Sequence, residues 1–502
     1  MRPSPLPFVL GCLFSVCSAL ASASTPSLAF HFDHLGYRPA DVKVLVMSSN
    51  PGASVEIHDS LGATVYTVPG SGGSIVSMGL DSNSGDTVWQ VTFTGFNTLG
   101  NGYTFYCPAL TATSYPFNIQ DNIYDAVGHA ALKVFFYQRC NGPKPAANAG
   151  VWSDASACHM SDANATVMPG NTNHGMLNLT GGWHDAGNYA KYMWYAFGDA
   201  VVPILRAYND NPGKLVDGDG NIPESGNGTP DVLDEMKWEL DWGLKMQLGA
   251  SAGSLNGAFL DRLDALPGVY TWSSPPSTDS TVRYYKDPTV ESCSIGTGSM
   301  AQAAVVYLAA GQPAYAATLR ASALSGWAYL QTLTPAAGDE TNKKAWAAAS
   351  IFLMDNTVAS ARTYVDNVYA WSSQFYDPEG WNTPAAFTYA QAPGATAAVV
   401  TAMKSSIANS VNRIMAFSDF YGAGMDNWEY YWGSLRPRAK FGLFLLEAAK
   451  LNATGGYTVA QVRNRSENYL HYFHGLNSLN MAYLSNLSSI GLEHSLYQLY
   501  HG

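Results

Sequence analysis

The stretch from Gly181 to Tyr192 brings together residue types that can do chemistry. It reads Gly-Gly-Trp-His-Asp-Ala-Gly-Asn-Tyr-Ala-Lys-Tyr and stands just ahead of a predicted helix. Glycines let the backbone approach a ligand closely. An aromatic such as Trp183 beside a carboxylate such as Asp185 is typical of a sugar site, with one group for stacking and one for proton chemistry. On these residues alone, a glycine-rich turn and a helix N-cap is the simpler interpretation.

The composition limits the class of protein. At 502 residues the chain is longer than one hydrophobic core usually supports, which predicts two domains. A hydrophobic share of 47% excludes disorder, and a charged share of only 13% indicates a surface of neutral polar and aromatic groups. The net charge of −12 argues against nucleic acid or an anionic membrane as a partner.

Residues 1–23 have the pattern of a secretory signal peptide. An apolar run from Phe8 to Leu20 follows the positive N-terminus, and small residues then precede a cleavage site after Ala23. Later stretches are too short or too polar to span a bilayer, so we expect an exported, extracellular protein without a membrane anchor. Export permits disulfides. We expect Cys140 and Cys158 to form one, because they flank a single loop.

The hydrophobic period changes along the chain. Residues 24–118 contain short β-branched and aromatic runs separated by turn residues, at the spacing of a small all-β sandwich. Residues 119–502 have a helical period, with about ten helices and no convincing strand. The second domain is therefore predicted to be all-α, with function carried by the loops between its helices.

A second stretch of sequence, within residues 221–247, helps to interpret residues 181–192. Residues 221–235 read Asn-Ile-Pro-Glu-Ser-Gly-Asn-Gly-Thr-Pro-Asp-Val-Leu-Asp-Glu, and residues 245–247 read Lys-Met-Gln. Together with residues 181–192 they resemble glycoside hydrolase family 9, the cellulase-type inverting enzymes. The strands after residues 31–39 resemble the immunoglobulin-like module that precedes many of these catalytic domains. The resemblance implies an (α/α)6 barrel of twelve helices, with an open cleft for a β-1,4-linked glucan.

The chain departs from the family pattern at the position that should carry the base. Inversion needs two carboxyl groups about 6.5–9.5 Å apart. In the family motif D-A-G-D the second aspartate is the general base and the first helps to hold the water. Asp185 matches the first, but Asn188 stands at the second. A neutral amide can orient water but cannot accept its proton, which leaves Asp185 as the alternative base.

A second departure concerns the general acid. The family places it on a glutamate well after a G-x-N loop, which residues 475–477 represent here. Glu493 follows that loop too closely to match. About ten helices in place of twelve point the same way, so we expect a barrel that is incomplete at its C-terminus. The sequence is then an incomplete copy or a degenerate relative; an incomplete copy is favoured, because an open barrel would expose apolar helix faces.

The resemblance also suggests contacts to sugar and to metal. Trp183, Tyr431 and Trp432 are candidates for stacking on sugar rings, and His184 for bonding a hydroxyl, each with core or loop packing as the alternative. No cofactor is required. Calcium is common in the family as a structural ion; weak candidates are residues 217–221, with alternating oxygen ligands, and Asp339 with Glu340. No metal position is assigned.

We therefore expect a secreted, monomeric glycosidase that hydrolyses β-1,4-glucan by inversion, in polysaccharide catabolism. Its substrate would be cellulose or cello-oligosaccharides. Two alternatives stay open. One is a catalytically impaired glucan-binding relative, which Asn188 favours, and the other is an exo-acting, glucosaminidase-like enzyme.

Overall fold

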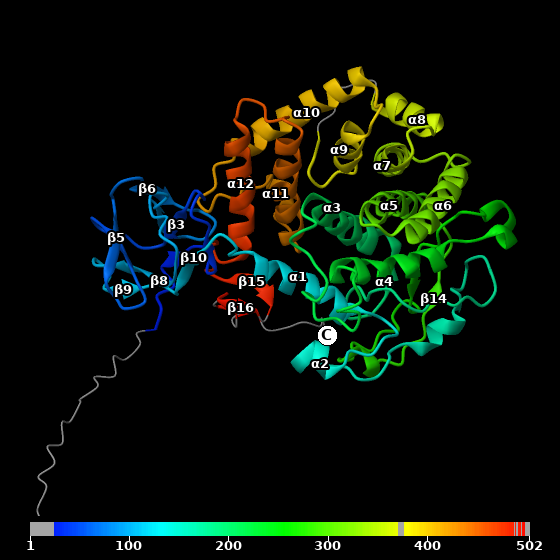
Figure 1. Cartoon of the computed structure of the whole chain (residues 1–502), viewed down its shortest axis with the longest axis horizontal. Coiled ribbons are helices and arrows are strands. Elements are labelled where there is room, and N and C mark those ends of the chain that lie inside the picture. Colours follow the sequence, from blue (N-terminus) through cyan, green and yellow to red (C-terminus); the bar gives the residue numbers. More distant parts are fainter. Residues whose placement is uncertain (1–24, 370–375, 486, 488–489, 493, 497–502) are drawn as a thin grey trace, which may run out of the picture.

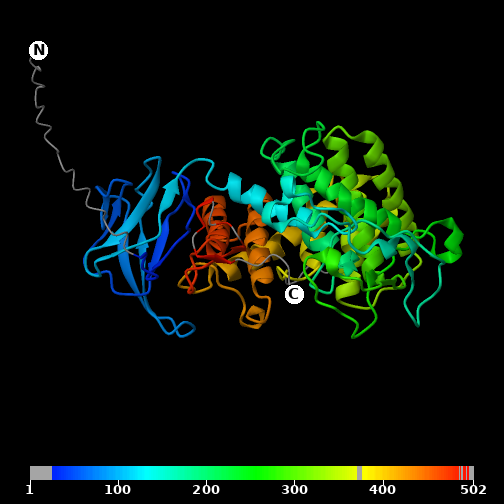
Figure 2. The same cartoon turned by 90° about the horizontal axis from the view of Figure 1, so that it is seen from below.

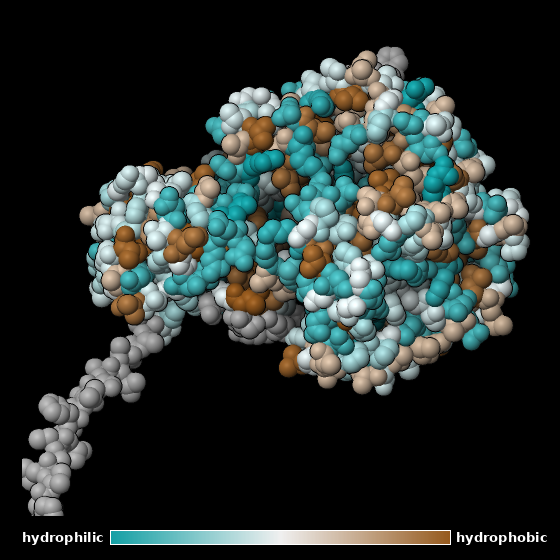
Figure 3. Space-filling view, viewed as in Figure 1, coloured by the Kyte–Doolittle hydropathy of each residue, from teal (hydrophilic) through white to brown (hydrophobic). Residues whose placement is uncertain are grey.

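The structure is a computed structural model that describes residues 25–369, 376–485, 487, 490–492 and 494–496. The predicted signal peptide lies outside the described residues. A β-rich module forms one end of the molecule and a larger helical domain the other (Figure 1, Figure 2). Among the described residues, every helix is too short or too polar to cross a bilayer. Hydrophobic side chains on the face in Figure 3 form small separate groups.

The β-module consists of two sheets packed face to face. One has the strand order β1-β3-β7-β6 and the other β2-β10-β8-β4-β5, with β9 paired to β8. Alternate residues point inward, as in β8, where Tyr103, Phe105 and Cys107 are buried. The strands are β1 (Phe30–His31), β2 (Gly36–Tyr37), β3 (Val44–Met47), β4 (Val55–His58), β5 (Thr64–Val68), β6 (Ser74–Leu80), β7 (Thr87–Thr92), β8 (Gly100–Cys107), β9 (Ala112–Thr113) and β10 (Phe117–Ile119).

The helical domain has eleven helices of nine residues or more among the residues that the structure describes. They are α1 (Asp125–Gln138), α3 (Val202–Asp210), α4 (Asp231–Met246), α5 (Val290–Ala309), α6 (Pro313–Leu330), α7 (Asp339–Met354), α8 (Ala359–Tyr369), α9 (Asn382–Gln391), α10 (Ala397–Met415), α11 (Leu435–Lys450) and α12 (Val459–Phe473), besides the short α2 (Ala146–Ala149). Helix α9 was not predicted from the sequence. The incomplete barrel stays a prediction.

Helix α5 lies at the centre of the helical domain and is buried along almost its whole length. Two of its glycines allow this close packing. A Cβ on Gly298 would meet the Trp346 ring of α7 at 2.5 Å, and one on Gly296 would meet the Phe259 ring at 2.6 Å. The helix starts with a capping box between Thr289 and Ser292. The capping box therefore sets where α5 begins, and packing on every side sets where the helix lies in the domain.

The helical domain also contains short strands, so the expectation of no strand after residue 119 is wrong. Strands β11 (Thr166–Val167), β12 (Lys191–Tyr192), β13 (Arg262–Asp264) and β14 (Tyr284–Tyr285) form a sheet in the order β11-β14-β13-β12. The pair β15 (Ala482–Ser485) and β16 (Ser495–Leu496) lies near the C-terminus. Strands of two to four residues are too short to show an alternating pattern in the sequence.

A buried carboxylate joins the β-module to α12, which lies beside it in Figure 1. Asp33 of the β-module accepts hydrogen bonds from Nδ1 of His471 (2.8 Å) and of His474 (2.9 Å). Burial opposes the charge of Asp33, but the two imidazoles outweigh it and hold the pKa of Asp33 well below its ordinary value. We call these three residues the interdomain cluster.

Replacing the carboxylate of the interdomain cluster should destabilise the protein. At pH 7, we expect Asp33→Asn to lower the free energy of unfolding by about 3–5 kcal/mol, the usual cost of breaking a buried ionic contact. The pKa of Asp33 is lower in the folded protein than in the unfolded chain. Its contribution to the free energy of unfolding is therefore fully present above about pH 4, the ordinary pKa of an aspartate, and is lost as the pH falls below that value. Denaturant unfolding at pH 7 and pH 3 measures both.

A matched control for this prediction is Asp121→Asn, since Asp121 is an exposed residue of the linker between the two parts. It should change the free energy of unfolding by less than about 0.5 kcal/mol. If Asp33→Asn is as stable as the control variant at pH 7, the cluster does not stabilise the domain contact.

Candidate active site

The loop before β12 presents Asp185 at the surface of the helical domain. The Asp185 N–H donates to the carbonyl of Ala190 at 2.8 Å, which closes the loop onto itself. Two positions need special backbone geometry. Gly182 has φ of 76°, and a Cβ there would meet the Trp242 ring at 2.8 Å. Tyr189 has φ of 54°. The loop is therefore held in one shape that projects the carboxylate outward.

Asp185 lies at a cavity of about 190 Å³, which we call the Asp185 cavity. Its other lining residues come mainly from α1 and from the segment around β12: Val134, Phe135, Gln138, Trp183, His184, Tyr192, Tyr195, Ala196 and Ala200. Asp185 is exposed, yet protein surrounds much of its carboxylate. This partial desolvation, with the nearby negative charge of Asp264, raises the pKa of Asp185. A raised pKa makes a carboxylate a better proton acceptor.

Trp183 contributes to the cavity wall from within the core. Its side chain is only 4% exposed, and its ring packs against Phe135 with centroids 4.6 Å apart. The indole N–H donates to the Glu235 carboxylate at 2.8 Å, and the Trp183 backbone N–H donates to Glu239 at 2.6 Å. Little of the Trp183 ring is therefore open for stacking, because the ring packs on Phe135 and its N–H is bonded to Glu235. Its expected contact with a sugar ring stays a prediction.

Tyr431 and Trp432 lie on an exposed loop before α11, and their role in sugar binding stays a prediction. Trp432 is 91% exposed and Tyr431 is 49% exposed. Trp428 and Tyr430, which were not predicted as site residues, are exposed on the same segment. We call residues 428–432 the aromatic loop. Exposed aromatic rings on one loop suit the apolar side of a sugar chain.

An arginine links the aromatic loop to the Asp185 side of the domain. The hydroxyl of Tyr431 is hydrogen-bonded to Arg436, whose guanidinium also contacts Asp199 at 2.8 Å. The charges of both Asp185 and Arg436 act on the pKa of Tyr195, which lines the Asp185 cavity. Arg436 therefore contacts both Tyr431 of the aromatic loop and Asp199.

Asn188 does not line the Asp185 cavity. Its side chain hydrogen-bonds the hydroxyl of Tyr192, which does line it. The same hydroxyl lies 3.4 Å from Oδ2 of Asp264 on β13. Asp264 was not predicted as a site residue, because nothing in the linear sequence joins residue 264 to residue 192. The short pairing of β12 with β13 brings them together.

The predicted disulfide between Cys140 and Cys158 is absent, and both are buried free thiols. Their sulfurs are 3.9 Å apart, whereas a disulfide needs about 2.05 Å. His159 and His184 complete the group: one donor atom from each of the four residues lies within 4.8 Å of all the others. We call this group the Cys/His tetrad. His184 is therefore a member of the tetrad and also lines the Asp185 cavity, and its expected contact with a sugar hydroxyl stays a prediction.

The charges around the tetrad favour the forms of the side chains that bind metal. Burial opposes ionisation of Cys140, but the Cys158 thiol and the positive charges of Arg283 and Lys191 outweigh it and hold the pKa of Cys140 well below its ordinary value. Arg283 Nη2 lies 2.9 Å from the Cys140 sulfur. Burial lowers the pKa of His184 to about 4, so that its ring is neutral.

The tetrad fits a zinc ion by donor type and by spacing. Structural zinc takes four thiolate or imidazole ligands in a tetrahedron, with Zn–S near 2.3 Å, which sets the ligands of one ion about 3.8 Å apart. The sulfurs are 3.9 Å apart, and Cys158 Sγ is 3.4 Å from His184 Nε2. Neither ring nitrogen of buried His159 has a hydrogen-bond partner. Unpartnered buried donors facing two thiols are the arrangement that a cation satisfies.

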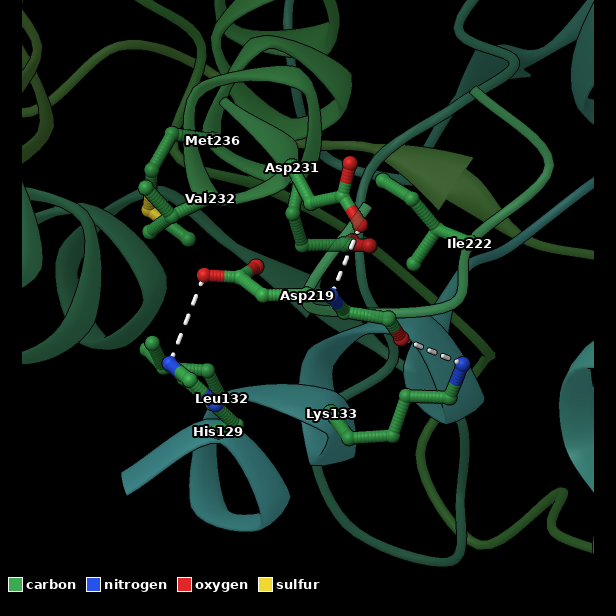
Figure 4. A pocket seen from close by; sticks show the side chains of 10 residues that line it. His129, Leu132, Lys133, Asp219, Ile222, Asp231, Val232 and Met236 are labelled. Carbon is green, nitrogen blue, oxygen red and sulfur yellow. Dashed lines mark hydrogen bonds and ion pairs between the residues drawn. The ribbon is translucent and has the colours of Figure 1, made fainter. Parts of the chain in front are cut away.

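The weak calcium candidate at residues 217–221 uses its oxygens within the protein. Asp217 accepts two backbone N–H bonds, at 2.6 and 2.7 Å. Figure 4 shows the adjoining pocket, where Asp219 pairs with His129 at 3.3 Å and Lys133 donates to a loop carbonyl at 2.8 Å. Calcium binding at residues 217–221 stays a prediction.

The other calcium candidate begins a helix. Asp339 pairs with Lys343 one turn along α7, and Glu340 accepts from the Ala336 N–H at 2.7 Å. These contacts are those of acidic residues in a first helical turn. Glu493, which the sequence analysis weighed as an acid, lies outside the described residues.

Comparisons with known proteins agree with this arrangement. Residues 124–501 match the family model of glycosyl hydrolase family 9, and residues 26–112 match the cellulase N-terminal ig-like domain. The chain is 25% identical to endoglucanase D of Acetivibrio thermocellus over 90% of this chain and 72% of that protein. It is 32% identical to a cellulose 1,4-beta-cellobiosidase of the same organism, over 43% of this chain and about a quarter (26%) of the relative.

Solved structures show the same fold. A metagenome-derived family 9 endoglucanase superposes with a TM-score of 0.76 at 25% identity, over 91% of this chain and 85% of that one. A Bacteroides ovatus family 9 structure gives a TM-score of 0.78 at 23% identity, over 92% and 87%. The expected fold class, an α/α barrel preceded by a small β-sandwich, is confirmed. On the match to residues 124–501, the chain belongs to glycosyl hydrolase family 9.

Proposed function

We propose that the chain is a secreted glycosidase that hydrolyses β-1,4-glucan with inversion of the anomeric carbon. The observation that carries this proposal is the Asp185 carboxylate, held at a cavity next to an aromatic loop in a family 9 domain. Relatives over most of the chain include an endoglucanase. A glucan would lie with its rings on the aromatic loop and one linkage at Asp185.

The residues of the Asp185 cavity would position the water that attacks the anomeric carbon of that linkage. The Asp185 carboxylate lines the cavity and suits a group that holds and orients the attacking water. Tyr192 and Tyr195 line the same cavity and place hydroxyls near the carboxylate. Water held on one face of the sugar attacks the anomeric carbon from that face, which inverts its configuration.

The test is hydrolysis of defined cello-oligosaccharides by the full chain, followed by proton NMR. We expect the first product to be the α-anomer, since inversion of a β-linkage gives it. A β-anomer as first product would contradict inversion. Binding of cello-oligosaccharides without turnover would support the glucan-binding alternative, and turnover only of glucosamine oligosaccharides would support the exo-acting alternative.

The glucan-binding alternative rests on one observation, the neutral amide at position 188. A site that keeps its aromatic loop but has lost its base would bind sugar chains without cutting them. The activity assay separates the two proposals directly.

We further propose that the Cys/His tetrad holds a structural zinc ion. Cys140, Cys158, His159 and His184 would supply four ligands, so no open position is left for substrate. When bound, zinc would cross-link the segments that carry these residues. Because His184 precedes Asp185 directly, the same ligand would fix the start of the catalytic loop.

A further inference from the structure

Tyr192 connects the Asp185 cavity to a carboxylate outside the family motif. Strand β12 pairs with β13 antiparallel, with Tyr192 opposite Arg262 and Lys191 opposite Leu263. This register places the Tyr192 hydroxyl 3.4 Å from Oδ2 of Asp264, two residues along β13 from Arg262. Residues two apart on a strand share a face. Tyr192, Arg262 and Asp264 therefore form one cluster on the cavity side of the small sheet.

One carboxylate oxygen of Asp264 faces the Tyr192 hydroxyl, and the other is held by a backbone N–H. The residue is 5% exposed. Its Oδ1 accepts the Ala265 N–H at 2.8 Å, and Arg262 Nε lies 3.5 Å from its Oδ2. The Arg262 guanidinium also stacks over the Tyr192 ring, 5.2 Å from its centroid. The arginine thus compensates the charge of Asp264 and leaves Oδ2 facing the Tyr192 hydroxyl.

Asn188 completes the arrangement from the other side of Tyr192. Its side chain is hydrogen-bonded to the same hydroxyl. An amide can donate to the phenol oxygen while the phenol O–H donates to Asp264, which gives one directed chain of hydrogen bonds. An aspartate at position 188 could only accept, and would compete with Asp264 for the single phenol proton. The amide at 188 and the carboxylate at 264 are therefore complementary.

We propose that Asp264 is the proton acceptor of this site, acting through Tyr192, in place of a carboxylate at position 188. The inference rests on the proposed glycosidase function. As the water oxygen bonds to the anomeric carbon, its proton passes to the Tyr192 oxygen and the Tyr192 proton passes to Oδ2 of Asp264. The glycosidic bond breaks, the leaving oxygen takes a proton from solvent water, and Asp264 then releases the proton it accepted to solvent. Asp185 holds the water at the cavity.

The central experiment moves the carboxylate between the two positions. We expect Asp264→Asn to lower kcat on cello-oligosaccharides by about 10²–10⁴-fold, the usual loss for one general base, with KM changed less than about threefold. The double variant Asp264→Asn with Asn188→Asp restores a carboxylate within reach of the same hydroxyl. The kcat of the double variant should be at least tenfold higher than that of Asp264→Asn. A purely structural role for Asp264 predicts no such recovery.

Two further variants keep the test decisive. Asp261→Asn is the matched control, because Asp261 precedes β13, is buried and lies 3.8 Å from Arg262 without touching Tyr192; it should keep kcat within about threefold. Tyr192→Phe removes the relay itself and should lose as much kcat as Asp264→Asn. If Asp264→Asn does not fold, Tyr192→Phe decides in its place.

The outcomes separate this inference from the proposed function. An active wild type whose Asp264→Asn or Tyr192→Phe variant keeps its full kcat overturns the role of Asp264 alone. A folded Asp264→Asn variant that loses kcat with no recovery from Asn188→Asp also overturns it. A wild type that hydrolyses no β-linked substrate overturns the proposed function, and the relay with it.

Discussion

Cys158→Ser is expected to release one zinc ion per chain and to lower the free energy of unfolding by more than about 4 kcal/mol. Loss of a metal is among the few single changes that exceed this value. Binding at four-ligand zinc sites is itself worth about 10–16 kcal/mol in small peptides. The Cys158 thiol is buried and lies against Cys140 and His184, so a serine would leave three ligands in a dry pocket.

Metal content by mass spectrometry and unfolding in denaturant measure the two effects. Cys293→Ser is the matched control, since Cys293 is also a buried free thiol of the helical domain but lies outside the tetrad. It should keep the zinc. Wild-type protein that carries no zinc, and in which non-reducing peptide mapping finds Cys140 bonded to Cys158, would restore the disulfide interpretation.

Asp185→Asn is expected to lower kcat on cello-oligosaccharides by about 10²–10⁴-fold, or roughly 3–5 kcal/mol of barrier. The carboxylate is the acidic group among the described lining residues of the cavity. Its replacement by an isosteric amide should leave the fold intact, because the residue is exposed and its backbone N–H, not its side chain, closes the loop. Oligosaccharide affinity should therefore change little.

Turnover assays and binding calorimetry on the same preparation check this prediction. The control is Asp287→Asn, an aspartate that accepts hydrogen bonds from Thr172 in an exposed loop. It should keep wild-type turnover. Full activity in Asp185→Asn would show that the working site lies elsewhere on the domain.

Long helices were predictable from the sequence, and short or irregular elements were not. Helices such as α10 and α12 have clear apolar faces over fifteen or more residues. Helix α9 was missed because it has ten residues, contains Pro384 near its start and is buried on most sides, which removes the polar face.

The site was predictable where a motif is contiguous and not where the fold brings distant residues together. Asp185 could be placed from the sequence, because its neighbours in the chain are also its neighbours in space. The tetrad draws on residues 140, 158, 159 and 184, and only the adjacent pair Cys158-His159 signalled a metal rather than a disulfide. Asp264 had no signal, because its role depends on a strand pairing of two residues.

The packing between the β-module and the C-terminal region has a consequence for the order of folding. Residues of both parts share small cores, such as Val46 and Val88 with Tyr421 and Leu476. The β-module is delivered first, but its partners follow about 360 residues later, roughly 20–70 s at ordinary rates of synthesis. One face of the module therefore stays exposed to water until its partner residues in the C-terminal region have been synthesised. That face is accessible to a chaperone during this interval.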